Sequence, residues 1–189
     1  AVAAVRSGDL ETFKTLINQD PTLATARSSR SHPTLLQCVA LDGKDKSNNV
    51  EMARVLIEAG AEIHEPLVAC ASMDNRAVAE LLLEHGAAID GTGGWLPLEE
   101  ALYWNSQNVL ALLLERGSSV QNLRIAAGLG RTNLIESYFN SDGSLRPDAG
   151  EINWPFGALP PIAQDRQAII NNAFVYACMH GHIDAARLL

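Results

Sequence analysis

Three stretches decide the fold: Val55-Leu56-Ile57-Glu58-Ala59-Gly60-Ala61, Leu81-Leu82-Leu83-Glu84-His85-Gly86-Ala87 and Leu112-Leu113-Leu114-Glu115-Arg116-Gly117-Ser118. Each has the pattern of the last turns of an amphipathic helix followed by a glycine. Glycine suits the residue after a helix because it adopts left-handed backbone without a Cβ clash. The three stretches are therefore predicted to be one structural element used three times.

The same helix is found at six places when the chain is read outward from these ends. Its copies start at Gly8, Asn48, Asp74, Asn105, Gly130 and Gly181. A short segment with small residues precedes each start: Ala3-Ala4, Val39-Ala40, Cys70-Ala71, Ala101-Leu102, Ala126-Ala127 and Ala177-Cys178. Small side chains let two helices approach closely, so the unit is predicted to be a helix, a turn and a second helix. One such unit cannot bury its apolar face alone, which predicts a stacked array.

This unit resembles the ankyrin repeat. Partial copies of that family's opening motif are found at Thr34–Gly43, in the Pro-Leu pairs Pro66-Leu67 and Pro97-Leu98, and at Gln121–Gly130. The resemblance implies an all-α, ankyrin-like helix-turn-helix solenoid of about six repeats with irregular loops. We expect one domain over 1–189, with repeats at about 1–27, 28–61, 62–87, 88–118, 119–141 and 171–189 and an insertion over 141–170.

The spacing of the repeats departs from the family. Successive second-helix starts lie between 25 and 51 residues apart, whereas regular ankyrin repeats recur about every 33 residues. Gly60–Glu65 and Gly117–Gln121 leave too little chain for a hairpin finger, so tight turns are expected there. The last copy stops inside its second helix, so we expect the remainder of that helix, and a capping repeat, to follow Leu189.

Composition excludes several classes of protein. The chain has 189 residues, a net charge of −8 and 47% hydrophobic residues, which fits a folded domain and argues against a general nucleic-acid binder. No apolar run reaches the roughly 20 residues that span a bilayer. Three cysteines form no disulfide framework and indicate a reducing, cytoplasmic location. Cys70 and Cys178 occupy small-residue positions, which predicts that both are packed in the core.

Patterns that carry chemistry are weak, so neither catalysis, a cofactor nor a metal is predicted. His180-Gly181-His182 lacks further metal ligands. Asn140–Leu145 resembles a calcium loop, but the required glycine is misplaced, and a turn at Asp142-Gly143 explains it better. Adjacent Glu99 and Glu100 diverge on a helix and would not flank one substrate. A catalytic thiol at Cys178 would need an aligned base, which His180 does not provide.

The resemblance implies a protein partner, bound on the concave face formed by the first helices. The residues just before each second helix are expected there, and many are of types enriched at interfaces. The candidates are Leu41, Asp42, Ser72, Met73, Tyr103, Trp104, Leu129, Met179 and His180. Trp154 and Phe156 of the insertion are further candidates, although they could instead cover the array.

The negative charge is concentrated in the middle of the chain. Between Glu51 and Arg116, eleven acids and three bases account for the whole net charge of −8. This asymmetry favours a partner with a basic surface, unless most of these acids line the solvent side of the second helices.

Two other hypotheses stay open. One is a small-ligand or enzymatic role where the insertion meets the last repeat, around Arg131, Trp154 and His180. The other is a purely structural part of a larger chain.

Overall fold

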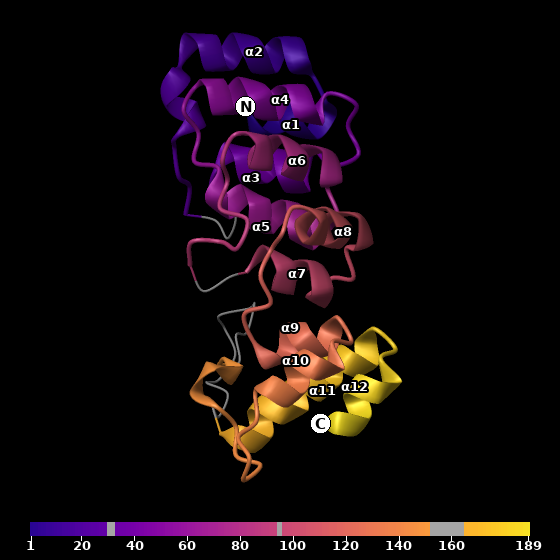
Figure 1. Cartoon of the computed structure of the whole chain (residues 1–189). Helices are drawn as coiled ribbons and strands as arrows, with labels where there is room; N and C mark the ends of the chain where they lie inside the picture. The colour runs from indigo at the N-terminus through magenta and orange to yellow at the C-terminus, as the bar shows by residue number, and fades with distance from the viewer. Residues whose placement is uncertain (30–32, 94–95, 152–164) are drawn as a thin grey trace. The chain divides into compact units, whose positions relative to one another are not determined.

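The computed structural model describes residues 1–29, 33–93, 96–151 and 165–189, and these are almost entirely helical (Figure 1). The chain divides into two compact units, Ala1–Ser118 and Ser119–Leu189. Within the described ranges, two isolated β-bridges are the only extended pairings. The expected all-α helix-turn-helix repeat is confirmed, while the expectation of one continuous domain stays a prediction.

The first unit contains four helix-turn-helix pairs. Their helices are α1 (Val2–Ser7) with α2 (Leu10–Gln19), α3 (Leu35–Leu41) with α4 (Asn49–Glu58), α5 (His64–Met73) with α6 (Arg76–Glu84), and α7 (Pro97–Tyr103) with α8 (Gln107–Glu115). A short 3₁₀ turn, η1 (Pro21–Ala24), follows α2. First helices pack on first helices, as α3 does on α5 and α5 on α7, and second helices pack on second helices.

The second unit contains two more pairs. They are α9 (Leu123–Gly128) with α10 (Thr132–Ser137), and α11 (Arg166–Met179) with α12 (Ile183–Leu188). A 3₁₀ turn, η2 (Pro147–Ala149), lies between them. α11 packs along α9 and α12 packs against α10. All six second helices expected from the sequence are therefore present, each beside a first helix.

The glycines after the second helices terminate them as expected. Gly60, Gly86 and Gly117 have φ of 85°, 87° and 87°. The amide of the residue after Gly60 donates to Leu56 O over 2.9 Å, which satisfies a carbonyl left free at the helix end. The same 2.9–3.0 Å bond recurs after Gly86 and Gly117.

The turns between paired helices also share one geometry. The residue at the predicted second-helix start has positive φ in five pairs, namely Gly8, Asp74, Asn105, Gly130 and Gly181. In the remaining pair, the extra residues Lys44–Ser47 replace this turn with a longer one. Asp and Asn tolerate left-handed backbone better than most residues do, which explains their presence at two of the five sites.

Loops differ between the repeats, as their unequal spacing predicts. The turns that follow α4 and α8 are short, whereas the segment before α3 contains an antiparallel bridge between Arg27 and Thr34. The expected turn at Asp142-Gly143 is confirmed: the Ser144 amide donates to Asp142 Oδ1 over 2.9 Å, inside a hairpin closed by Phe139 and Leu145.

The described part of the insertion packs on its own unit. Ala149 is buried in a cluster with Leu123 and Ile170, and the Arg124 guanidinium donates to the Glu151 carbonyl. The last residues of the insertion expected over 141–170 belong to α11, which starts at Arg166.

The cores consist of small and aliphatic side chains from the facing helices. In the first unit, Leu36, Met52, Leu67 and Leu82 are fully buried. Cys70 is also buried, and burial raises the pKa of its thiol. The prediction for Cys178 was wrong, because this residue is exposed. It is among the residues that line an open hollow along α11 and α12.

Side-chain hydrogen bonds connect neighbouring repeats in addition to their apolar packing. Asn75 Nδ2 donates to Ala40 O over 3.0 Å. The Asp74 carboxylate accepts the amides of Asn108 and Val109, both over 2.9 Å, at the first turn of α8. A carboxylate here satisfies free helix amides and lies at the positive end of the helix dipole. The turn of one repeat therefore caps the second helix of the next.

We predict that Gly130→Ala destabilises the second unit more than Gly181→Ala does. Both glycines have left-handed backbone, with φ of 66° and 71°, so each alanine costs about 1–2 kcal/mol. Only at Gly130 would the new Cβ lie 2.6 Å from His182 Nδ1, so the imidazole must also move. Urea unfolding followed by circular dichroism measures the difference, and equal losses would contradict the contact.

We predict that Asp74→Gly destabilises the first unit by about 1–2 kcal/mol, because the cap on α8 is lost. Glycine keeps the left-handed turn, so the side-chain bonds alone are tested. Asn105→Gly is the matched control, since Asn105 has the same backbone, with φ of 56°, and its side chain accepts from Gln107 Nε2. Equal stability of the two variants in urea would show that the Asp74 bonds contribute nothing.

Candidate partner-binding surface

Two exposed apolar side chains lie at the same position of neighbouring repeats. Met73 precedes the left-handed Asp74, and Trp104 precedes the left-handed Asn105. Met73 is 38% exposed and Trp104 is 46% exposed, and the helices α5 and α7 that end beside them pack together. Helix packing therefore gives two neighbouring repeats of the first unit an apolar residue at the same turn.

Trp104 is held in place by two contacts. Its ring lies edge-on to the half-buried Tyr103, with centroids 5.1 Å apart and planes at 86°. Its indole N–H donates to Glu100 Oε1 over 2.8 Å. An amphipathic ring fixed in this way offers contact area at a low entropic cost to binding.

Burial raises the pKa of the Glu100 carboxyl, with the Trp104 hydrogen bond acting against this rise and the charge of Glu99 adding to it. Glu99 itself is buried at the start of α7. The surface beside Trp104 therefore combines an aromatic face with a carboxylate that water solvates incompletely.

The other predicted residues of the first unit contribute less apolar surface. Asp42 is exposed and pairs with Arg6 over 2.9 Å. Leu41 and Ser72 are half-buried, and the Ser72 hydroxyl donates to Ala69 O over 2.9 Å. This unit thus presents Met73 and Trp104 as its main apolar contacts at the predicted positions.

In the second unit the predicted residues are Leu129, Met179 and His180. Met179 is exposed, while Leu129 and His180 are half-buried. The His180 ring stacks on His182 with centroids 6.3 Å apart. Whether these residues bind a partner together with Met73 and Trp104 stays a prediction.

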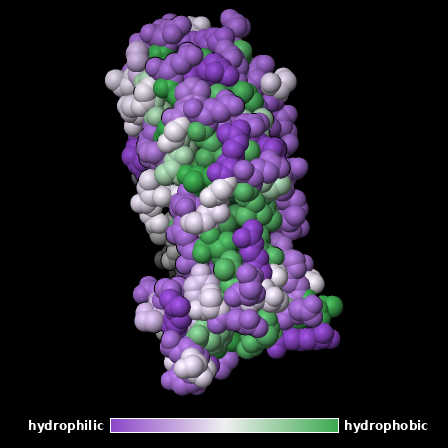
Figure 2. All heavy atoms as spheres, viewed as in Figure 1, coloured by the Kyte–Doolittle hydropathy of each residue, from purple (hydrophilic) through white to green (hydrophobic). Residues whose placement is uncertain are grey.

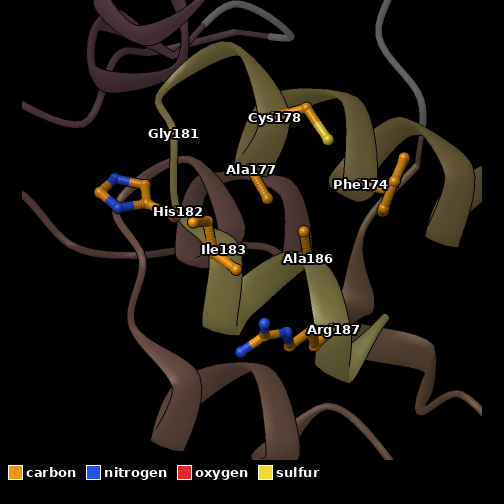
Figure 3. A pocket seen from close by; sticks show the side chains of 8 residues that line it. All are labelled: Phe174, Ala177, Cys178, Gly181, His182, Ile183, Ala186 and Arg187. Carbon is orange, nitrogen blue, oxygen red and sulfur yellow. The ribbon is translucent and has the colours of Figure 1, made fainter.

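The remaining candidates concern the insertion. Trp154 and Phe156 lie outside the described residues. Arg131, the third member of the alternative ligand site, is exposed just before α10. An open hollow of about 380 Å³ lies along α11 and α12 (Figure 3), and neither Arg131 nor His180 is among the residues described as lining it.

Searches of the described residues for other kinds of site found none. No group of three or more His, Cys, Asp or Glu residues there is placed to hold a metal ion. No helix in that part of the chain has both the length and the apolar character needed to cross a bilayer.

The acids between Glu51 and Arg116 lie on first helices as well as on second helices. Two of the three bases there pair across neighbouring second helices, Arg76 with Glu115 over 2.9 Å and Arg116 with Glu80 over 3.1 Å. Second helices carry Glu51, Glu58, Glu80, Glu84 and Glu115, and first helices carry Glu65, Glu99 and Glu100. The excess acid is therefore not confined to the second-helix side.

Comparison with known protein families gives one match. Residues 45–124 match a model of ankyrin repeats in three copies. No curated protein matches the chain. The matched range covers α4 to the beginning of α9, and the helix-turn-helix pairs continue on both sides of it. Residues 45–124 are therefore similar to ankyrin repeats, which in general serve as protein–protein interaction modules.

Glu100 is the residue beside Trp104 that the sequence analysis did not include among the candidates. The sequence predicts only that Glu99 and Glu100 do not flank one substrate, and it predicts no contact between Glu100 and Trp104. Residues four apart lie on the same helix face, so the spacing of Glu100 and Trp104 could have indicated their contact. The burial that raises the pKa of Glu100 depends on the packing around α7, which the spacing does not give.

We predict that Glu100→Gln raises the melting temperature at pH 7. Burial favours the neutral form of Glu100, so its ionised form costs stability above its raised pKa, and glutamine still offers Trp104 an acceptor. The advantage should shrink as the pH falls through that pKa, where wild-type Glu100 becomes protonated on folding. Thermal unfolding across a pH series measures this effect.

Glu84→Gln on α6 is the control, since it removes the same charge from an exposed side chain. An equal rise in melting temperature for both variants would mean that lower net charge, rather than the burial of Glu100, is responsible.

Proposed function

We propose that the protein binds another protein through the turns of its first helices, with Met73 and Trp104 as the main anchors. The observation that carries this proposal is the exposure of both side chains at equivalent positions of adjacent repeats. Met and Trp are enriched at interfaces, and a large ring held by its neighbours is typical of a binding hot spot. The proposed function has no catalytic step.

The proposed partner presents a lysine or arginine beside its apolar contact. Trp104 offers a face for a cation–π contact, and Glu100, 2.8 Å from the indole nitrogen, supplies the matching negative charge. The net charge of −8 supports a basic partner, because it accelerates encounter with such a surface at low salt. Leu41, Asp42, Ser72 and Tyr103 accompany these anchors in the proposal, and Leu129, Met179 and His180 are the corresponding candidates of the second unit.

We predict that Trp104→Ala, alone or with Tyr103→Ala, removes partner capture while helicity is unchanged. Loss of an interface tryptophan costs about 2 kcal/mol or more, which is roughly a thirtyfold loss of affinity. The wild-type chain and the variants would serve as baits in extracts of the native cell, and mass spectrometry would compare the captured proteins. Circular dichroism checks the helicity.

Glu100→Gln tests the charge separately from the fold. It should weaken capture and make the remaining binding less sensitive to salt, although it is expected to raise the melting temperature. Binding to wild type should also weaken as the pH falls through the pKa of Glu100. Capture that survives both Trp104→Ala and Met73→Ala would contradict the proposed surface.

A further inference from the structure

Two histidines of the α5–α6 pair bind opposite kinds of backbone group. The Ala88 amide donates to His64 Nδ1 over 3.0 Å, so this nitrogen carries no proton and the neutral ring holds its proton on Nε2. His85 Nδ1 lies 2.8 Å from Leu81 O, and because a carbonyl only accepts, this nitrogen carries a proton. Protonation of the two rings therefore has opposite consequences for their hydrogen bonds.

The His64 bond connects the loop after α6 to the start of α5. Ala88 lies in the described part of that loop, residues 85–93, which leads toward α7. The Gly91 amide closes a turn onto Ala88 O over 2.9 Å, so this turn moves with Ala88. On the other side, the Glu62 carboxylate accepts the His64 amide, which fixes the helix start that carries the ring. Loss of the bond would therefore release the turn at Ala88 and leave the start of α5 in place.

Water reaches this hydrogen bond in the folded protein. His64 and Ala88 are both half-buried, so the pair lies at the surface of the first unit. Much of that surface is hydrophilic in the view of Figure 2. The ring can therefore exchange a proton with solvent while the repeat stays folded.

Charged side chains come from several elements around the start of α5. They are Arg27 before α3, Glu62 and Glu65 at the start of α5, Glu84 and Asp90 around the end of α6, and Glu99 and Glu100 in the first turn of α7. Arg27 and Glu65 pair with each other over 2.9 Å. Within the described part of the chain, no ion pair involves the His64 ring. The bond to Ala88 is therefore the polar contact of the ring that protonation changes.

We propose that the His64–Ala88 hydrogen bond is a pH-sensitive contact that holds the loop after α6 to α5. Histidine titrates between about pH 5 and 8. When the His64 ring takes up a proton on Nδ1, the Ala88 amide faces an N–H instead of a lone pair, and the bond is lost. The bond is thus present above the titration of His64 and absent below it.

His85 keeps its own bond when it is protonated, because its Nδ1 already carries the donated proton. Its added positive charge lies at the negative end of the α6 dipole, which is favourable. Acid therefore releases the turn at Ala88 while the end of α6 stays closed. The proposal does not depend on the partner site at Met73 and Trp104.

NMR spectroscopy of the 189-residue chain between about pH 5 and 8 tests the proposal. The Ala88 amide should shift with the same midpoint as the His64 ring. Its protection against hydrogen exchange, corrected for the intrinsic effect of pH, should fall about fivefold on acidification, as expected for one lost hydrogen bond. The Ala87 amide, which donates to Leu82 O over 3.0 Å, should keep its protection.

Three variants make the test specific, and circular dichroism checks that each is folded. His64→Asn offers an oxygen acceptor that does not titrate in this range, so Ala88 should stay protected throughout. His64→Ala removes the acceptor, so Ala88 should be poorly protected at every pH. His85→Gln is the matched control in the same turn and should leave the wild-type response unchanged.

Three outcomes would overturn the proposal. One is an Ala88 amide whose shift does not follow the midpoint of His64. Another is equal protection of Ala88 in wild type and His64→Ala at neutral pH. The third is a response that disappears in His85→Gln, because that would assign it to the other ring. If His64→Asn does not restore the bond, the wild-type midpoints and His64→Ala still decide.

Discussion

Burial of one helix pair by the next is the constraint on which the rest of this structure depends. A pair of short helices exposes a stripe of Leu, Ala and Val that only a neighbouring pair can cover. The requirement for close approach explains the small residues in the first helices, such as Ala71 and Ala127, which are fully buried. It also explains why residues at the same position of two repeats can differ in burial: Leu123 is fully buried, whereas Phe174, at the same position of the last described pair, is 45% exposed.

Polar side chains at the turns also align each helix pair with its neighbour. Asp74 lies in the turn of one repeat and caps α8 of the next, and Asn75 Nδ2 reaches the Ala40 carbonyl. These bonds fix neighbouring pairs in place without using the residues just before the turn. Met73 and Trp104, which come just before two of these turns, keep 38% and 46% of their surface exposed, and this exposure connects the architecture to the proposed function.

Electrostatics links the two roles of Glu100. Partial burial favours its neutral form, so its ionised form costs stability, while its carboxylate accepts a hydrogen bond from the Trp104 ring and, in the proposed function, offers a charge to a basic partner. A residue whose charge favours binding but lowers the stability of the fold is expected at a functional surface. Glu80 of α6 and Glu115 of α8 differ from Glu100, because their ion pairs with Arg116 and Arg76 connect neighbouring second helices.

The sequence by itself determined the helix-turn-helix unit, its six copies and most of its ends. These features depend on local periodicity and on glycines such as Gly60, whose conformation follows from the missing Cβ. Only the tertiary structure decided which small residues are covered. Cys178 lies at the same distance before its left-handed turn residue, Gly181, as Ala71 does before Asp74, yet Ala71 is buried and Cys178 is exposed. Likewise, Asp74 and Val109 are 35 residues apart, and only stacking brings this cap onto its helix.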